Sequence, residues 1–266
     1  MMSTMSSEIQ KLDNRHLLRG MWMRFGNRKG YPHFIFDFSG KRIVYCYIRK
    51  NACSAFKGLI VGLSNADPKP QYQDVLQYIL QHHRCQYPQD FTQADHIIFV
   101  HRDPIDRIIS LFINKFIQQR GNTDIFNNYR AMTGSDPRAA NFRDFVESYL
   151  PKDMKKLDPH VIPQFDHLLP VVYTESIPLA RLHEAMAGIL NEQIADTYFS
   201  QKVNATISSG QDYDDPMAAQ IPAIKLRQTW LAEGTLPTKK SFIDNEMHLD
   251  KKLQSIYAKD AIFQAQ

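Results

Sequence analysis

The sequence predicts a three-layer α/β fold with a mainly parallel central sheet flanked by helices, and two segments support this prediction. Each begins with a short apolar run typical of a strand buried on both faces, at residues 42–48 and 96–100. Each run is followed by a polar stretch and then by apolar residues at helical spacing. We therefore expect the two strands to be neighbours, with the functional residues at their carboxyl ends.

The first segment changes character between Ile48 and Ala55. The residues between its strand and its helix are small, polar or cationic: Arg49, Lys50, Asn51, Ala52, Cys53 and Ser54. Ser54 is placed to cap a helix whose apolar positions continue to Leu63. A helix that begins beside a buried strand directs unpaired backbone N–H groups and a positive dipole end at whatever lies above the sheet. The loop therefore predicts an anion site.

This loop has the position of a phosphate-binding P-loop but not its residues. The P-loop pattern requires two glycines, and the segment has no glycine before Gly58. We therefore expect a P-loop-like fold and disfavour a nucleotide triphosphatase. An ordinary strand-to-helix turn with solvated lysines is the alternative that the loop alone leaves open.

The second segment places an arginine at the carboxyl end of its strand. His101-Arg102-Asp103-Pro104 follows the strand, and proline suits a first helical turn because its missing N–H would have no partner there. Ser110 lies about two turns into the helix. A guanidinium can form two parallel hydrogen bonds with a phosphate monoester, and a serine hydroxyl can donate another. Arg102 and Ser110 are therefore candidate phosphate ligands.

Both segments resemble the cofactor motifs of sulfotransferases, in particular the Golgi-type carbohydrate sulfotransferases (family 2) and their bacterial relatives. The first resembles the family's 5′-phosphosulfate loop, Pro-Lys-x-Ala-Cys-[Ser/Thr]-x-[Trp/Phe]-Lys, with matches at Lys50, Ala52, Cys53, Ser54, Phe56 and Lys57. Arg49 replaces the family's proline and adds a positive charge to the loop. The second resembles the family's 3′-phosphate motif, Arg-Asp-Pro-x-x-Arg-x-x-Ser, with matches at Arg102, Asp103, Pro104, Arg107 and Ser110.

The resemblance implies transfer of a sulfuryl group from 3′-phosphoadenosine 5′-phosphosulfate (PAPS) to a hydroxyl of a carbohydrate or glycolipid, without a metal. Lys50 would neutralise the leaving phosphate oxygen. Arg102 and Ser110 would bind the 3′-phosphate. The other residues that the resemblance assigns to the cofactor are Arg49, Asn51, Ala52, Cys53, Ser54 and Lys57.

A histidine is expected to take the acceptor proton. In related sulfotransferases the base often comes from the segment between the two cofactor motifs, where His82 and His83 end a predicted helix. Their alternative role is that of surface histidines favoured at a helix end by the dipole. His160 is the third candidate because residues 157–164 resemble a family segment of the form His-x-x-Pro-Gln, and loop packing is its alternative.

Three later segments complete the predicted organisation. Residues 118–143 suggest a loop-rich insertion that could act as a substrate lid. Residues 168–173 predict a further strand, followed by a helix that continues to Leu190. The last helix resembles the family's closing motif, with matches at Ile256, Tyr257, Asp260 and Phe263.

Composition favours one domain over residues 1–266, with residues 1–40 as an N-terminal extension packed on it. The chain has 266 residues, 43% of them hydrophobic, and no repeat. A net charge of +4 suits anionic ligands but falls short of a nucleic-acid footprint. Three cysteines form neither a disulfide framework nor a metal pair. With no signal-peptide pattern and no long apolar run, we expect a cytoplasmic, bacterial protein.

Two hypotheses from other classes remain open. Cys53 could be a nucleophile, since its place at a helix start beside Lys50 suits a thiolate, but it would need a paired histidine. Alternatively, the basic loops could belong to a non-catalytic module that binds an anionic polysaccharide or nucleic acid, which the modest net charge does not encourage. The sequence does not predict the oligomeric state.

Overall fold

The computed structural model describes residues 32–65, 69, 71, 74–121, 123–200, 212–243 and 247–263. They divide into two compact units, each with its own hydrophobic core. Unit 1 consists of the described residues within Met1–His101 and Asp166–Val203. Unit 2 consists of those within Arg102–Phe165 and Asn204–Gln266. The single-domain organisation stays a prediction. Most of the expected N-terminal extension, residues 1–31, lies outside the described residues.

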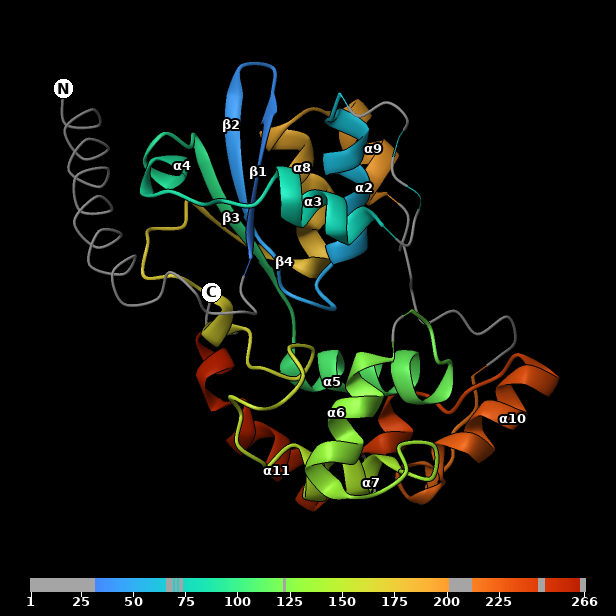
Figure 1. The fold of residues 1–266 in the computed structure, drawn as a ribbon. Helices are drawn as coiled ribbons and strands as arrows, with labels where there is room; N and C mark the ends of the chain where they lie inside the picture. Colours follow the sequence, from blue (N-terminus) through green and yellow to red (C-terminus); the bar gives the residue numbers. More distant parts are fainter. Residues whose placement is uncertain are drawn as a thin grey trace. The chain divides into compact units, whose positions relative to one another are not determined.

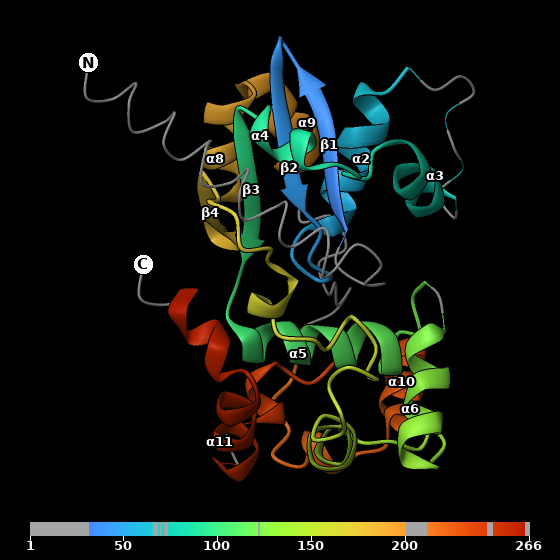
Figure 2. The ribbon, with the colours of Figure 1, turned by 60° about the vertical axis from the view of Figure 1, so that its left-hand side comes forward.

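Unit 1 is built on a four-stranded sheet in the order β1-β2-β3-β4 (Figures 1 and 2). The strands are β1 (His33–Phe38), β2 (Lys41–Cys46), β3 (His96–His101) and β4 (Glu175–Pro178). β1 and β2 are antiparallel, whereas β2, β3 and β4 run parallel to one another. The α/β fold with a mostly parallel sheet is therefore confirmed.

The hairpin between β1 and β2 turns at Ser39 and Gly40. Both residues have positive φ angles, 48° and 77°, which is the backbone of the tight turns that suit the twist of a hairpin. On the other side of β2, Val44 pairs with Ile97 of β3. The two strands that the sequence predicts to be neighbours are therefore neighbours.

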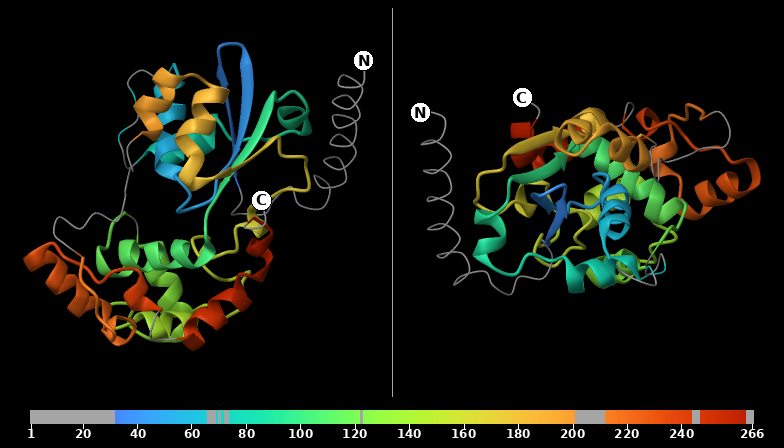
Figure 3. Two further views of the ribbon diagram at one scale, coloured as in Figure 1. Left: turned by 180° about the vertical axis from the view of Figure 1, so that it is seen from behind. Right: turned by 90° about the horizontal axis from the view of Figure 1, so that it is seen from above.

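Helices cover the sheet because residues along each strand alternate between two apolar clusters. Phe34, Tyr45 and Ile98 belong to the larger cluster, on the face that packs against α-helices. These helices are α2 (Cys53–Leu63), α3 (Val75–His82), α8 (Leu182–Ile189) and α9 (Glu192–Phe199), and Figure 3 shows α8 and α9 in orange beside the blue α2. Val44 and Ile97 face the opposite way, towards the short α4 (Pro88–Thr92) and the loop at 169–173.

Unit 2 is helical in its described part, around a core rich in aromatic rings. Its α-helices are α5 (Pro104–Phe112), α6 (Asp124–Thr133), α7 (Phe142–Asp144), α10 (Ala223–Glu233) and α11 (Met247–Ile256). Two π-helical turns continue α5 and α7, and they are η1 (Ile113–Ile117) and η2 (Phe145–Tyr149). Across both units, the 3-10 turns within the described residues are η3 (Phe165–His167), η4 (Leu179–Arg181), η5 (Ala218–Gln220), η6 (Lys240–Phe242) and η7 (Ala258–Phe263).

Two predicted elements are wrong in detail. The strand expected at 168–173 is a loop, because Pro170 has no N–H and the Leu169 N–H donates to the Tyr173 hydroxyl, at 2.9 Å, instead of to a strand. Pairing with β3 begins at Thr174, whose N–H donates to the Ile97 carbonyl. The insertion at 118–143, expected to be rich in loops, contains the helix α6. This helix forms because Ile125 and Tyr129, one turn apart, are buried on one face.

The contact between α2 and α9 gives a test of the packing in unit 1. A Cβ atom added at Gly62 would lie 2.8 Å from Cζ of Tyr198 and closer still to its hydroxyl oxygen. One turn earlier, a Cβ at Gly58 would meet the same ring at an ordinary 3.6 Å. Gly62→Ala should therefore lower the free energy of unfolding by about 1–2 kcal/mol, because the ring must leave its place.

Gly58→Ala is the matched control, and it should be neutral or stabilising by up to about 1 kcal/mol because alanine is the better helix former. Urea unfolding of the two variants measures both values. Equal stabilities of the two variants would contradict the packing of Tyr198, from α9, against Gly62 of α2.

Candidate functional site

The loop between β2 and α2 is fastened to the carboxyl end of β3 by Asn51. This side chain is fully buried, and its Nδ2 donates to the Val100 carbonyl at 2.8 Å. Its backbone N–H donates to Ile48, and its carbonyl accepts from the Tyr45 hydroxyl at 3.4 Å. Phe56 of α2 stacks on the Tyr45 ring, with centroids 3.8 Å apart. The loop therefore has a fixed conformation above two neighbouring parallel strands.

Two residues of the loop have the left-handed backbone conformation that side chains rarely adopt. Lys50 has φ 71° and Ala52 has φ 55°. Such a conformation costs of order 1 kcal/mol per residue and persists where the surrounding structure requires it. Here it turns the chain abruptly from strand to helix. It also leaves Lys50 half-buried at the start of α2.

The helix begins two residues earlier than the sequence predicts. Ala52 occupies the N-cap position, and its carbonyl accepts from the N–H groups of Ala55 and Phe56. Ser54 lies inside the first turn, so the prediction that it caps the helix is wrong. The N–H groups of Cys53 and Ser54 belong to the first turn of α2, where backbone N–H groups point beyond the helix start. They are placed to donate to an anion.

The cationic side chains of the loop have different environments. The Arg49 guanidinium lies over the Tyr47 ring, 5.6 Å from its centroid. Arg49, which replaces the family's proline, therefore packs on the residue that follows β2. Lys57 is half-buried in the second turn of α2. Within the described residues, no hydrogen bond joins Cys53 to a histidine. The loop therefore presents positive charge and a helix N-terminus, but no cysteine–histidine pair.

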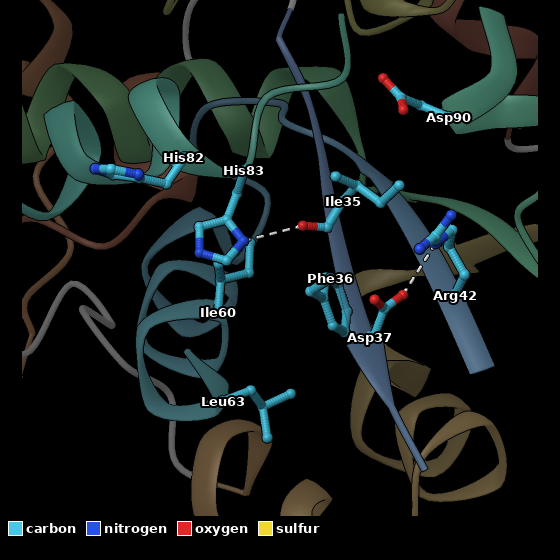
Figure 4. A pocket seen from close by; sticks show the side chains of 9 residues that line it. All are labelled: Ile35, Phe36, Asp37, Arg42, Ile60, Leu63, His82, His83 and Asp90. Carbon is cyan, nitrogen blue, oxygen red and sulfur yellow. Dashed lines mark hydrogen bonds and ion pairs between the residues drawn. The ribbon is translucent and has the colours of Figure 1, made fainter. Parts of the chain in front are cut away.

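His82 and His83 line a pocket at the edge of the sheet, beside β1 (Figure 4). His83 Nδ1 lies 3.1 Å from the Ile35 carbonyl and must donate, since a carbonyl only accepts. Burial lowers the pKa of His83, which favours its neutral form. The pocket has a volume of about 320 Å³, and its other lining residues are Ile35, Phe36, Asp37, Arg42, Ile60, Leu63 and Asp90.

This pocket lies at the end of unit 1 that is remote from the loop. Ile35 pairs with Val44, four residues before the loop's Ile48, which is about 13 Å along a strand. The pocket also contacts Leu63 in the last turn of α2, whereas the loop lies at the first turn. The geometry of unit 1 therefore does not support His82 or His83 as a base for chemistry at the loop.

In unit 2, Arg102 follows β3 directly and has a largely buried guanidinium. Its Nη2 lies 3.4 Å from Asp106 Oδ2, and Lys239 shares the same carboxylate at 3.0 Å. Burial lowers the pKa of Arg102, and Asp106 offsets this in part. A desolvated and incompletely compensated cation stabilises a bound anion. Ser110, the second expected phosphate ligand, lies on α5 and is 6% exposed.

Arg107 has a different role from Arg102, although both match the same family motif. It is fully buried, and its guanidinium donates to the carbonyls of Ile162 and His160, at 2.9 and 3.0 Å. The Gln164 side chain exchanges two hydrogen bonds with the Arg102 backbone. Arg107 therefore holds the segment that contains His160, and Gln164 joins that segment to the chain at Arg102.

Asp260 and Tyr257, near the end of the chain, hold the same segment. The Asp260 carboxylate accepts the N–H groups of Gln164 and Phe165, at 3.0 and 2.9 Å. The Tyr257 hydroxyl donates to the Val161 carbonyl at 2.7 Å. These two residues belong to the closing motif, and their function as clamps for a distant loop was not evident in the sequence.

His160 is the expected base that the structure places in a charged environment. Its Nδ1 lies 2.6 Å from Asp158 Oδ1, and both side chains are largely buried. Sequence analysis missed Asp158, although the short Asp-Pro-His spacing was a possible signal. His160 belongs to unit 2, whereas the loop with Lys50 belongs to unit 1.

The described residues also contain one group with the composition of a metal site, which the sequence did not reveal. His183 of α8 and Glu192 and Asp196 of α9 bring one ligand atom each within 4.8 Å of one another. His183 already pairs with Asp196 at 2.8 Å, and both carboxylates are exposed. This arrangement is satisfied as a surface ion pair and needs no metal.

Asn51→Ala should lower the free energy of unfolding by about 1–3 kcal/mol, because it leaves the buried Val100 carbonyl without this donor. Urea unfolding measures the loss. Asn127→Ala, at an exposed position of α6, is the matched control and should change stability by less than about 0.5 kcal/mol. If the two variants are equally stable, the Asn51 hydrogen bond does not hold the loop.

Comparison with known proteins supports the resemblance carried by the loop and by the Arg102 motif. A family profile described as the sulfotransferase family matches residues 32–177. Carbohydrate sulfotransferase 14 of Mus musculus is 28% identical over 167 residues, which cover 53% of this chain and 40% of that protein. The Homo sapiens protein of the same name is 26% identical over the same length.

The matched region spans less than half of these curated relatives. No solved structure matches the chain. No described helix combines the length and apolar character needed to cross a membrane. Since the family profile covers more than half of the 266 residues, including both cofactor-like motifs, the chain belongs to the sulfotransferase family.

Proposed function

We propose that this protein transfers a sulfuryl group from PAPS to a hydroxyl of an acceptor. The observation that carries the proposal is the conformation of the β2–α2 loop. The loop is fixed by Asn51, turns through left-handed residues at Lys50 and Ala52, and opens a helix N-terminus beside a lysine. Backbone donors at a helix start with a nearby cation form a binding site for a phosphate-like anion.

The 5′-phosphosulfate is assigned to this loop and the 3′-phosphate to Arg102 and Ser110, following the family motifs. The first-turn N–H groups of Cys53 and Ser54 would donate to the phosphosulfate oxygens. Arg102 suits the 3′-phosphate because its guanidinium is desolvated and has a carboxylate partner at a long 3.4 Å. A phosphate there would give the guanidinium charge-assisted hydrogen bonds in place of the hydration that burial removes.

Sulfuryl transfer resembles phosphoryl transfer in its loose, in-line transition state, so positioning and charge stabilisation supply most of the rate. The acceptor oxygen forms a bond to sulfur while the bond from sulfur to the 5′-phosphate oxygen breaks. Lys50 stabilises the charge that develops on this leaving oxygen. The acceptor proton goes to His160, and the second product is adenosine 3′,5′-bisphosphate.

A carbohydrate or glycolipid is the proposed acceptor, because both curated relatives are named as carbohydrate sulfotransferases. The cytoplasmic location stays a prediction. The alternative with Cys53 as nucleophile gains no support from the geometry, since no described histidine is hydrogen bonded to the thiol.

The cofactor assignment predicts that adenosine 3′,5′-bisphosphate raises the melting temperature of the protein by mass action, whereas adenosine 5′-monophosphate does so much less. Arg102→Ala should weaken binding of the bisphosphate by roughly 2–4 kcal/mol, because it removes the guanidinium from a doubly charged group. Isothermal titration measures the affinity. Folding should persist, since Asp106 keeps its ion pair with Lys239.

Arg181→Ala is the matched control, because Arg181 is an exposed arginine that also pairs with a carboxylate. It should leave the bisphosphate affinity unchanged. Unaltered affinity in Arg102→Ala would remove Arg102 from the 3′-phosphate site. Absence of any melting shift with millimolar bisphosphate would favour the non-catalytic binding module.

Lys50→Ala should lower kcat by about a hundredfold or more with a much smaller change in cofactor affinity, because Lys50 acts mainly in the transition state. The left-handed backbone strains alanine and lysine alike, so the fold should persist.

Cys53→Ser should change kcat only slightly. Steady-state release of adenosine 3′,5′-bisphosphate measures all variants, with Lys41→Ala, at the other end of β2, as the control. An inactive Cys53→Ser beside an active Lys50→Ala would establish the cysteine hypothesis instead.

A further inference from the structure

The pair formed by His160 and Asp158 is more than a surface ion pair. Asp158 Oδ1 accepts twice from His160, from the ring Nδ1 at 2.6 Å and from the backbone N–H at 2.8 Å. The side chains are 14% and 6% exposed. A buried carboxylate that receives two hydrogen bonds from one residue fixes both the rotation of the ring and the nitrogen that carries its hydrogen.

Asp158 is itself held by residues of α6 and η2. Its backbone N–H lies between two acceptors, Asn128 Oδ1 at 3.0 Å and the Tyr149 hydroxyl at 3.2 Å. The Tyr149 hydroxyl donates to the same Asn128 oxygen at 2.5 Å. Burial raises the pKa of Tyr149, so its hydroxyl keeps its hydrogen. The carboxylate therefore starts from a fixed backbone.

The other side of His160 is fixed by Arg107. Its guanidinium binds the carbonyls of His160 and Ile162, while Tyr257 binds the carbonyl between them. A fully buried arginine costs much desolvation free energy unless its donors are used, and here they are used on the backbone that carries the imidazole. Arg107 belongs to the motif that resembles a phosphate site, yet its guanidinium donates to the protein carbonyls of Ile162 and His160.

We propose that Asp158 is a positioning residue that holds the His160 imidazole with its hydrogen on Nδ1 and its lone pair on Nε2, and that Arg107 fixes the backbone beneath it. The inference rests on the proposed function, in which Nε2 takes the acceptor proton. Because an ionised carboxylate only accepts hydrogen bonds, it selects this tautomer.

The positioned ring completes the transfer step without another reactant. As the acceptor oxygen bonds to sulfur, its proton moves to Nε2, and the electron pair of the broken sulfur–oxygen bond leaves with the bisphosphate. The resulting imidazolium is stabilised by Asp158. Among the described residues, two more charged groups bind this segment: the Arg107 guanidinium, on the His160 carbonyl, and the Asp260 carboxylate, on Gln164 and Phe165.

The first test reads the tautomer and needs no substrate. Nitrogen-15 NMR of the wild-type imidazoles, at a pH where the rings are neutral, should show His160 with its hydrogen on Nδ1. His160→Gln assigns the signal. Asp158→Asn should move the population towards the Nε2 tautomer, because the amide can donate to Nδ1. A wild-type ring with its hydrogen on Nε2 would overturn the inference, whatever the variant does.

The second test is kinetic. Asp158→Asn should lower kcat by about 10²- to 10⁴-fold while the affinity for adenosine 3′,5′-bisphosphate changes little. Asp153→Asn, an exposed carboxylate in the same loop, is the control and should retain activity. A kcat within threefold of the wild type in Asp158→Asn would overturn the positioning role.

The two tests distinguish this inference from the proposed function. If wild-type protein transfers no sulfuryl group, the proposed function fails, while the NMR result still decides whether Asp158 sets the tautomer. If transfer occurs but the tautomer is the wrong one, the proposed function stands and the role of Asp158 is rejected.

Discussion

The hydrogen bond from the buried Asn51 amide to the Val100 carbonyl is the interaction on which the candidate donor site depends. It joins the loop after β2 to the end of β3, so the two parallel strands and the start of α2 form one rigid platform. With that bond in place, the left-handed conformations at Lys50 and Ala52 are imposed by their surroundings. The chain then presents a helix N-terminus and a lysine without needing the glycines of a P-loop.

Much of unit 1 could be predicted because its signals are local. The apolar runs around Val44 and Ile98, and the turn residues at Ser39-Gly40, are sufficient to predict a hairpin and two parallel strands. The predicted start of α2 was wrong because Ser54 is a favoured capping residue, whereas the actual N-cap is Ala52. The left-handed backbone of Ala52 leaves no signal in the sequence. The strand at 168–173 was misjudged because its apolar residues pack on the sheet as a loop around Tyr173.

The sequence could predict those residues of the candidate site that lie within short contiguous motifs. Lys50 and Arg102 could be identified because each lies in a short motif close behind a buried strand. Asp158, by contrast, acquires its role through a hydrogen bond to His160 that itself depends on residues far along the chain, such as Asp260. Long-range side-chain contacts of this kind leave no periodic pattern in the amino-acid sequence. The same limit explains why His83, well placed in the sequence, lies beside Ile35 instead of the loop.

The most direct test of the account is transfer from PAPS that carries labelled sulfur, with fractionated polysaccharides and glycolipids as acceptors. The wild-type protein should place label on a carbohydrate fraction and release one equivalent of adenosine 3′,5′-bisphosphate for each group transferred. Release without transfer would show that the right acceptor was absent. If the protein neither binds the bisphosphate nor consumes PAPS with any fraction, the account is contradicted.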